Sequence, residues 1–284
     1  VSDVVSSNDT LGYSDIVLPA TAWSEKDGTV TNSERTISRQ RGLLPPRGEA
    51  RHDWQIICDV AQAMGFDQGF NFEHPAEIFA EHAGLSAYQN NGSRDFDLSG
   101  LCGLTRQQYD DFKPIQWPVT ERSKAGTARL FTDGKFFTSS GRAKFIAVDA
   151  KQPEQQVSTA YPWVLNTGRI RDQWHTMTRT ALSTQLNQHI SEPFLALHPD
   201  DAKSQMIQPG QLVELTSAQT QMLGQTKPVV LRIEYDKGMR QGHCFAPIHW
   251  SQENTSGASI TRLFSSANDP ISGQPELKHA AVAI

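Results

Sequence analysis

The chain has 284 residues, of which 37% are hydrophobic and 20% are charged, a balance typical of one large or two ordinary globular domains. Its net charge of −5 argues against a general electrostatic attraction for nucleic acid. No stretch approaches the roughly 18 consecutive apolar residues of a membrane-spanning helix. We therefore expect neither a nucleic-acid nor a membrane partner.

The first residues read as a strand that enters a loop. The chain starts with Val1 rather than Met, without a signal-like leader, and Val4 and Val5 run directly into a polar stretch. These features predict that the chain is a piece of something longer. Residues 14–18 then predict a short strand, with Pro19 as its stop.

Helices are expected in the middle of the first half. Asp27-Gly28 is a strong turn signal, and Asp53 is a candidate N-cap. Apolar residues at helical spacing follow Asp53, and Gly65 provides a stop; these apolar residues are Trp54, Ile57, Val60, Ala61 and Met64. Residues 75–84 predict a second short helix, whereas residues 86–160 predict mainly irregular structure.

The pattern changes after a polar, Pro-containing linker candidate at residues 151–156. A short amphipathic helix is predicted over residues 200–206, with a turn at residues 208–210. Short strands are predicted over residues 161–165, 211–216, 228–235 and 242–249, the second and third joined by a polar loop. Several short strands separated by turns indicate a small barrel or sandwich.

The stretch from Asn166 to Arg179 is unusually rich in hydrogen-bond donors. It contains three Arg, three Thr, one His, one Gln and one Trp, with a single acid. One interpretation is a polar surface loop. The other is a site for a large ligand rich in acceptors, such as a pyrophosphate-linked one.

Four segments in order along the chain resemble the molybdopterin oxidoreductases that carry a bis-guanine-dinucleotide molybdenum cofactor. They are Asp15–Ala20 with Trp23, Glu25–Thr29, Thr31-Asn32 and Glu34-Arg35; Gly48–Arg51 with Asp53-Trp54; Thr167–Thr176; and Asp269–His279. The last segment, with Pro247–Trp250, is most similar to the cytoplasmic assimilatory nitrate reductases of that family.

This resemblance implies an α/β and β fold in two domains. Residues 1–155 would be the closing part of a Rossmann-like α/β molybdopterin domain, and residues 156–284 a six-stranded double-psi β-barrel that binds the dinucleotide. The cofactor would be Mo-bis(molybdopterin guanine dinucleotide). A [4Fe–4S] cluster and the molybdenum ligand would belong to a portion preceding Val1, so we expect no metal ligand within this chain.

The resemblance also carries over cofactor-binding positions. In the first domain these are Ser2, Asp3, Lys26 and Asp53. In the second they are Thr167, Gly168, Arg169, Gln173, Trp174, His175, Thr176, Trp250, Thr261 and Lys278. Thr261 departs from the family, which usually has Asn there, and Thr lacks the two-ended hydrogen bonding of an amide.

Plainer roles remain open for several of these residues. Asp53 is equally suited to capping its helix, and Lys26 to a solvated turn. Trp174 and Trp250 are residue types that more often belong to a core or an interface. No catalytic nucleophile or acid–base pair stands out, which fits chemistry carried by a cofactor.

The leading hypothesis is therefore the C-terminal, cofactor-binding portion of a nitrate reductase that reduces nitrate to nitrite in the cytoplasm. Its electron donor would be ferredoxin, flavodoxin or an NADH-dependent reductase component. The alternatives are a formate dehydrogenase-like enzyme or other oxyanion reductase of the same superfamily, and a catalytically silent nucleotide-binding fragment. The 284 residues alone are expected to be inactive.

Overall fold

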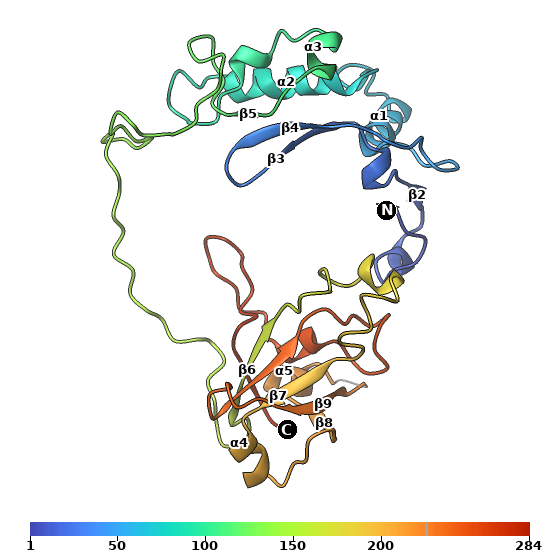
Figure 1. Ribbon diagram of the computed structural model, residues 1–284, viewed down its shortest axis with the longest axis vertical. Helices are drawn as coiled ribbons and strands as arrows, with labels where there is room; N and C mark the ends of the chain where they lie inside the picture. Colours follow the sequence, from blue (N-terminus) through green and yellow to red (C-terminus); the bar gives the residue numbers. More distant parts are fainter. Residues whose placement is uncertain (225–226) are drawn as a thin grey trace. The chain divides into compact units, whose positions relative to one another are not determined.

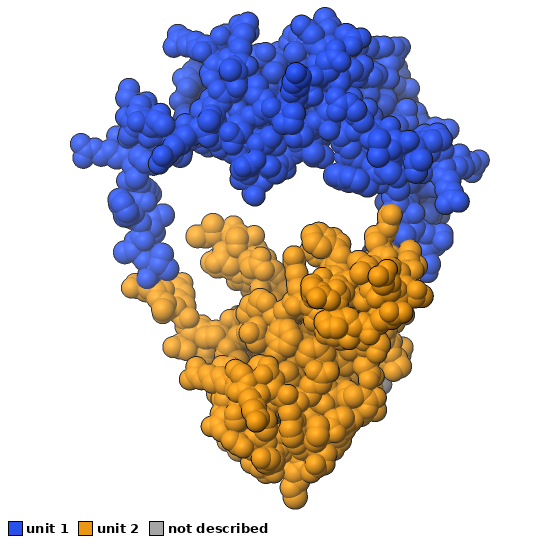
Figure 2. Space-filling model, viewed as in Figure 1, with its two compact units in different colours: residues 1–148 blue, residues 149–284 orange. Residues whose placement is uncertain are grey.

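The computed structural model describes residues 1–224 and 227–284, which form two compact units (Figure 2). Unit 1 comprises Val1–Val148 and unit 2 comprises Asp149–Ile284. Each unit has its own apolar core, with Leu98 fully buried in the first and Leu197 in the second. Among the helices within the described ranges, none is both long and apolar enough to cross a lipid bilayer.

Unit 1 opens with two short parallel strands, β1 (Ser2–Asp3) and β2 (Leu18–Pro19). The amides on either side of Pro19 donate to carbonyls of the β1 segment, so this ladder needs no N–H at Pro19 itself. Two predictions are therefore wrong. The strand expected over residues 14–18 starts at residue 18 and includes the proline, and the strand expected to reach Val5 ends at Asp3.

A three-stranded antiparallel sheet follows, with strand order β3–β4–β5. Its strands are β3 (Gly28–Thr31), β4 (Thr36–Gln40) and β5 (Ile115–Gln116). Helices α2 (Pro75–Ala87) and α3 (Arg106–Asp110) lie over this sheet (Figure 1). Ile37 of β4 shares one apolar cluster with Phe79 of α2 and Tyr109 of α3, which holds the helices on the sheet.

The predicted helices are present, with differences at their ends. Helix α1 (Asp53–Ala63) has His52 rather than Asp53 at its N-cap, and Gly65 follows its end with a φ of 87°. Helix α2 continues three residues past the predicted stop at residue 84. Most of the apolar face predicted for α1 is exposed, namely Ile57, Val60 and Met64. The periodicity identified the helix but not which of its faces unit 1 covers.

The buried guanidinium of Arg39 connects β4 to three neighbouring segments. Its side chain is 2% exposed, and it holds the carboxylate of Asp27 with two hydrogen bonds of 2.9 and 3.0 Å. It also donates to the backbone carbonyls of Tyr109 and Gly28, and it lies 4.1 Å from the centre of the Tyr109 ring. Burial raises the pKa of the Tyr109 hydroxyl to about 12.

Unit 2 is built on one six-stranded sheet, with strand order β11–β6–β10–β7–β9–β8. The strands are β6 (Trp163–Gly168), β7 (Phe194–Leu197), β8 (Leu212–Leu215), β9 (Val229–Tyr235), β10 (His243–Pro247) and β11 (Ala280–Val282). The β6–β10 and β7–β9 pairs are parallel, and the other pairs are antiparallel. Alternate side chains of each strand point into the core, as Val229, Leu231 and Ile233 do in β9.

The sheet curls so that its two edges meet at one end. Thr216 follows β8 and Ala283 follows β11, and these two residues exchange a pair of backbone hydrogen bonds of 3.0 and 2.9 Å. The mixed α/β chain therefore ends in a curled six-stranded sheet.

Several expectations for unit 2 need correction. Strand β6 extends to Gly168, so the donor-rich stretch begins inside the sheet rather than in a turn. The connection between β8 and β9 contains a short helix, α5 (Ala218–Met222), where only a loop was expected. Strands β7 and β11 were not predicted. Helix α4 (Pro199–Ser204) lies close to its predicted position.

We expect Arg39→Ala to lower the free energy of unfolding of the chain by roughly 3 kcal/mol, because it leaves the partly buried Asp27 without its partner. Arg39→Lys should restore little of this, since a lysine cannot reproduce the two-pronged contact. Urea denaturation followed by circular dichroism measures both.

The matched control is Arg106→Ala, which removes an exposed pair with Glu77 on the same unit. Its denaturation midpoint should stay close to that of the unsubstituted chain. Equal midpoints for the Arg39 and Arg106 variants would show that the buried contact does not stabilise unit 1.

Candidate functional site

The parallel strands β6 and β10 end next to each other. Gly168 pairs with Pro247, and the amide of Ile248 donates to the carbonyl of Gly168 at 3.0 Å. Parallel pairing brings the carboxyl ends of both strands to the same edge of the sheet. Residues 169–179 therefore leave the sheet beside the residues that follow β10.

Thr167 and Lys278 contact each other at this edge. The Thr167 side chain is buried, and its hydroxyl donates to the carbonyl of Leu277 at 2.5 Å. The ammonium group of Lys278 donates to the carbonyl of Thr167. This contact uses one of the three N–H donors of the ammonium group, and it fixes a positive charge beside the end of β6.

Gly168 is a position where a side chain would collide with the site. A Cβ built there would lie 2.7 Å from the ring of Phe245 and 4.0 Å from the nitrogen of Lys278. The missing side chain therefore leaves room for the Phe245 ring against the end of β6.

The fully buried imidazole of His249 joins the two ends of residues 170–175, the segment that follows β6. Its Nε2 accepts from the amide of Ile170 at 2.9 Å, and its Nδ1 lies 2.7 Å from the carbonyl of His175. An amide can only donate and a carbonyl can only accept, so the ring is neutral with its proton on Nδ1. Burial, and then the charges of Arg169 and His175, hold the pKa of His249 below its usual range.

The exposed tip of the segment carries a cation and two rings. The guanidinium of Arg169 lies 5.6 Å from the centre of the Trp174 ring, which meets the His175 ring edge-on at 4.6 Å. Trp174 is 61% exposed, and Arg169 and His175 are also exposed. His175 adopts a φ of 45°, a left-handed conformation that is uncommon for residues other than glycine.

The one acid of the donor-rich stretch is paired with an arginine and a histidine. Asp172 accepts from Arg171 at 2.9 Å and lies 2.7 Å from the Nδ1 of His189. The hydrogen bond from Arg171 is the main reason that the pKa of this carboxyl lies below its usual value. Asp172 is therefore ionised and paired, and its charge is offset near an approaching anion.

Other predicted residues of unit 2 lie deeper or elsewhere. Gln173 is buried and hydrogen-bonds Thr180 and Asn187 within its own loop. Trp250 is 4% exposed, with its ring beside that of His249. The exposed Thr176 and Thr261 have hydroxyl partners close in sequence, at Thr178 and Ser259 respectively.

The predicted residues of unit 1 form two groups. Asp3 uses its carboxylate locally, accepting from the amides of Val4 and Val5 and from the side chain of Asn8 at 2.8 Å, while Ser2 beside it is exposed. Lys26 and Asp53 form an ion pair with 2.5 Å between the ammonium nitrogen and the carboxylate oxygen. Their side chains are 32% and 50% exposed, so this pair remains accessible to a ligand.

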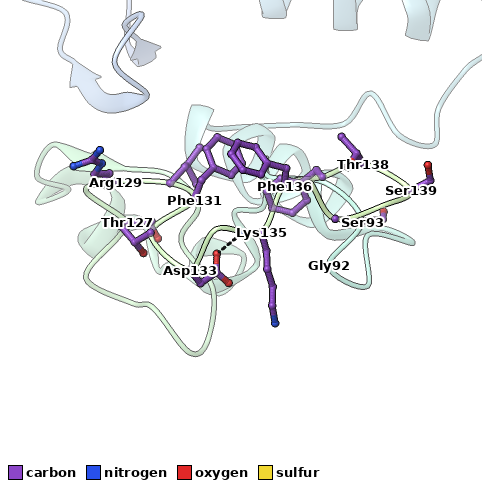
Figure 3. A pocket seen from close by; sticks show the side chains of 14 residues that line it. Gly92, Ser93, Thr127, Arg129, Phe131, Asp133, Lys135, Phe136, Thr138 and Ser139 are labelled. Carbon is purple, nitrogen blue, oxygen red and sulfur yellow. Dashed lines mark hydrogen bonds between the residues drawn. The ribbon is translucent and has the colours of Figure 1, made fainter. Parts of the chain in front are cut away.

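Two features escaped the sequence predictions. His249 appeared there only within a matching tetrapeptide, since nothing in the sequence shows that its strand pairs with the donor-rich one. The second is a pocket of about 770 Å³ in unit 1, lined by residues 92–93 and by most residues between 127 and 141 (Figure 3). The rings of Phe131 and Phe136 stack there at 4.6 Å. None of the predicted site residues lines this pocket.

Across residues 1–224 and 227–284, no group of three or more His, Cys, Asp or Glu side chains is placed to hold a metal ion. Cys244 is buried in the core of unit 2, and His243 before it points to the opposite face of β10, as expected for neighbours in a strand. The arrangement as a whole suits an anionic, acceptor-rich ligand at the end of β6.

Comparisons with known proteins agree with this chemistry. Residues 163–281 match the family described as "Molydopterin dinucleotide binding domain", and residues 1–63 match "Molybdopterin oxidoreductase". The chain also resembles the solved structure of acetylene hydratase from Pelobacter acetylenicus, with a TM-score of 0.67 over 94% of this chain and 37% of that one. At 17% identity, this likeness shows a shared fold.

Curated relatives are closer in sequence. The chain is 44% identical to a nitrate reductase of Klebsiella oxytoca, over 100% of this chain and 31% of that protein. It is 31% identical to the assimilatory nitrate reductase catalytic subunit of Bacillus subtilis, over 98% of this chain and 36% of that protein. It is 34% identical to the F420-dependent formate dehydrogenase subunit alpha of Methanocaldococcus jannaschii, over 97% of this chain and 37% of that protein.

The chain thus spans about a third of the length of these curated relatives. The two family matches lie in the order that the resemblance implies. The match over residues 163–281 contains the site at the end of β6. The chain belongs to the molybdopterin oxidoreductases, and its residues 163–281 carry their dinucleotide-binding domain.

Proposed function

We propose that unit 2 binds a guanine-dinucleotide tail and the pterin edge of Mo-bis(molybdopterin guanine dinucleotide) at the end of β6. The observation that supports this most is the donor set there. Lys278 and Arg169 bring positive charge for a pyrophosphate beside Gly168 at the end of the strand. These residues fit a cofactor that is anionic and rich in acceptors.

The remaining predicted positions divide by exposure. As direct contacts we propose Ser2, Asp3, Lys26 and Asp53 in the first domain and Trp174, His175, Thr176 and Thr261 in the second. For Thr167, Gln173 and Trp250 we propose a supporting role, because their side chains are buried within unit 2. A rigid supporting layer keeps contact residues in one geometry.

The domain assignment is also a proposal. We assign residues 1–155 to the closing part of a Rossmann-like domain and residues 156–284 to a six-stranded double-psi barrel. The parallel β1–β2 pair supports the first assignment. The hydrogen bonds between Thr216 and Ala283, which bring the sheet edges together, support the second.

For the complete protein we propose a cytoplasmic nitrate reductase of nitrate assimilation. The similarity to the nitrate reductases of Klebsiella oxytoca and Bacillus subtilis supports this choice. The similarity to F420-dependent formate dehydrogenases supports a formate dehydrogenase-like enzyme as the second candidate. A catalytically silent fragment remains the outcome if neither activity is found.

When bound, the molybdenum cofactor would supply the oxygen-atom transfer that converts nitrate to nitrite. The residues of this chain would bind and orient it. We place the [4Fe–4S] cluster and the molybdenum ligand in a part of the longer protein outside this chain. Ferredoxin, flavodoxin or an NADH-dependent reductase component would be the electron donor.

The deciding experiment uses the longer protein that contains this chain. We expect the purified protein to contain molybdenum, to release GMP on acid hydrolysis of its cofactor, and to reoxidise a reduced viologen dye when nitrate is added. Dye reduction by formate, without nitrate-dependent reoxidation, would instead favour the second candidate. Absence of both molybdenum and GMP would contradict the proposed cofactor site.

Removing the charge of Lys278 should weaken cofactor retention. We expect Lys278→Met in the longer protein to lower molybdenum and GMP content at least tenfold after dialysis, because a charge-assisted contact is lost. The matched control is Lys203→Met on α4, whose side chain is 71% exposed. Equal cofactor content in the two variants would argue against a role for Lys278 in binding.

A further inference from the structure

We infer that His249 is a positioning residue: its neutral imidazole holds residues 170–175 in the conformation that presents Arg169, Trp174 and His175 to the dinucleotide. This inference rests on the proposed function, because it names a residue that acts through the contact residues. It adds a residue absent from the contacts proposed above.

The geometry of the two hydrogen bonds carries this inference. They join His249 to the first and last residues of the 170–175 segment, with the Ile170 amide at 2.9 Å and the His175 carbonyl at 2.7 Å. A single rigid ring therefore fixes the distance between the two ends. Because the ring is fully buried, water has little access to its two nitrogens.

The segment itself needs such a restraint. His175 and Met177 both adopt left-handed backbone conformations, with φ values of 45° and 63°. Non-glycine residues hold such conformations where the surrounding contacts require them. Ordering the segment before the ligand arrives removes an entropic cost from binding, so loss of the restraint should appear as weaker ligand binding.

The same geometry makes the restraint sensitive to acid. Protonation of Nε2 would remove the acceptor that the Ile170 amide uses, leaving two N–H groups facing each other. Among the described residues, Arg169 and His175 are the charged or titratable groups that act on the ring, and the neutral Trp250 ring lies 6.4 Å away. Both groups oppose protonation when charged.

The direction of the pH effect follows from the lowered pKa. The folded state binds this proton less readily than the unfolded state does. The contribution of His249 is therefore complete above the ordinary histidine pKa of about 6.5, and it is lost progressively as the pH falls below that value.

Three substitutions separate the two contacts in the 284-residue chain. His249→Leu removes both. His249→Asn keeps a donor near the position of Nδ1, and His249→Gln keeps an acceptor near the position of Nε2, while neither amide titrates. The control is His243→Gln, at the opposite end of β10, where burial also lowers the histidine pKa.

The probe is guanosine diphosphate, which carries a guanosine and a pyrophosphate, with binding measured by calorimetry between pH 5.5 and 7.5. We expect His249→Leu to bind roughly tenfold more weakly than the unsubstituted chain at pH 7.5, with the Asn and Gln variants in between. Binding to the unsubstituted chain and to His243→Gln should weaken as the pH falls. Binding of guanosine diphosphate to the Asn and Gln variants should depend less on pH.

Nuclear magnetic resonance gives a readout independent of any ligand. The ¹⁵N shifts of His249 should show a proton on Nδ1 at pH 7.5, and the Ile170 amide should be protected from hydrogen exchange in the unsubstituted chain and less so in His249→Leu. If the Leu variant fails to fold, as judged by circular dichroism, the Asn and Gln variants decide the outcome.

The outcomes distinguish this inference from the proposed function. If guanosine diphosphate does not bind the unsubstituted chain, the proposed site is contradicted, and the nuclear magnetic resonance data alone decide whether His249 restrains the segment. If it binds all His249 variants equally, with one common pH profile, the positioning role is overturned while the proposed site stands.

Discussion

The parallel pairing of β6 with β10 is the contact on which the whole candidate site depends. Its register places Gly168 beside Pro247, so two segments that are far apart in sequence leave the sheet at one edge. From this arrangement follow the reach of His249 to the 170–175 segment and the position of Phe245 against Gly168. Strand β11 on the other side of β6 brings Lys278 to the same place.

The two units use charged side chains in different ways. In unit 1 the guanidinium of Arg39 is buried. It pairs with a carboxylate and donates to several carbonyls, so it holds neighbouring segments together. In unit 2 the cations of Arg169 and Lys278 are exposed; Lys278 donates to a backbone carbonyl, and Arg169 lies near the Trp174 ring. The second arrangement suits recognition of an anion, because the charges remain accessible.

Local patterns predicted the local structure well. Periodicity and Gly65 placed α1, Pro75 placed the start of α2, and alternation placed β8 and β9. Strands β7 and β11 escaped because each is only three or four residues long and fully apolar, without alternation. Pairing between distant strands leaves no local signal in the sequence. The contacts of Thr167, Lys278 and His249 could therefore not be predicted from local patterns. The family resemblance supplied positions, but not these contacts.

The hydrogen bonds between Thr216 and Ala283 have a consequence for solubility. Strands β8 and β11 are the edges of the sheet, and an unpaired edge offers its backbone to strands of other molecules. Joining the edges at one end leaves less of each one available for such intermolecular pairing. A chain shortened by its last two residues would lose this protection, and self-association through β8 would then compete with correct folding.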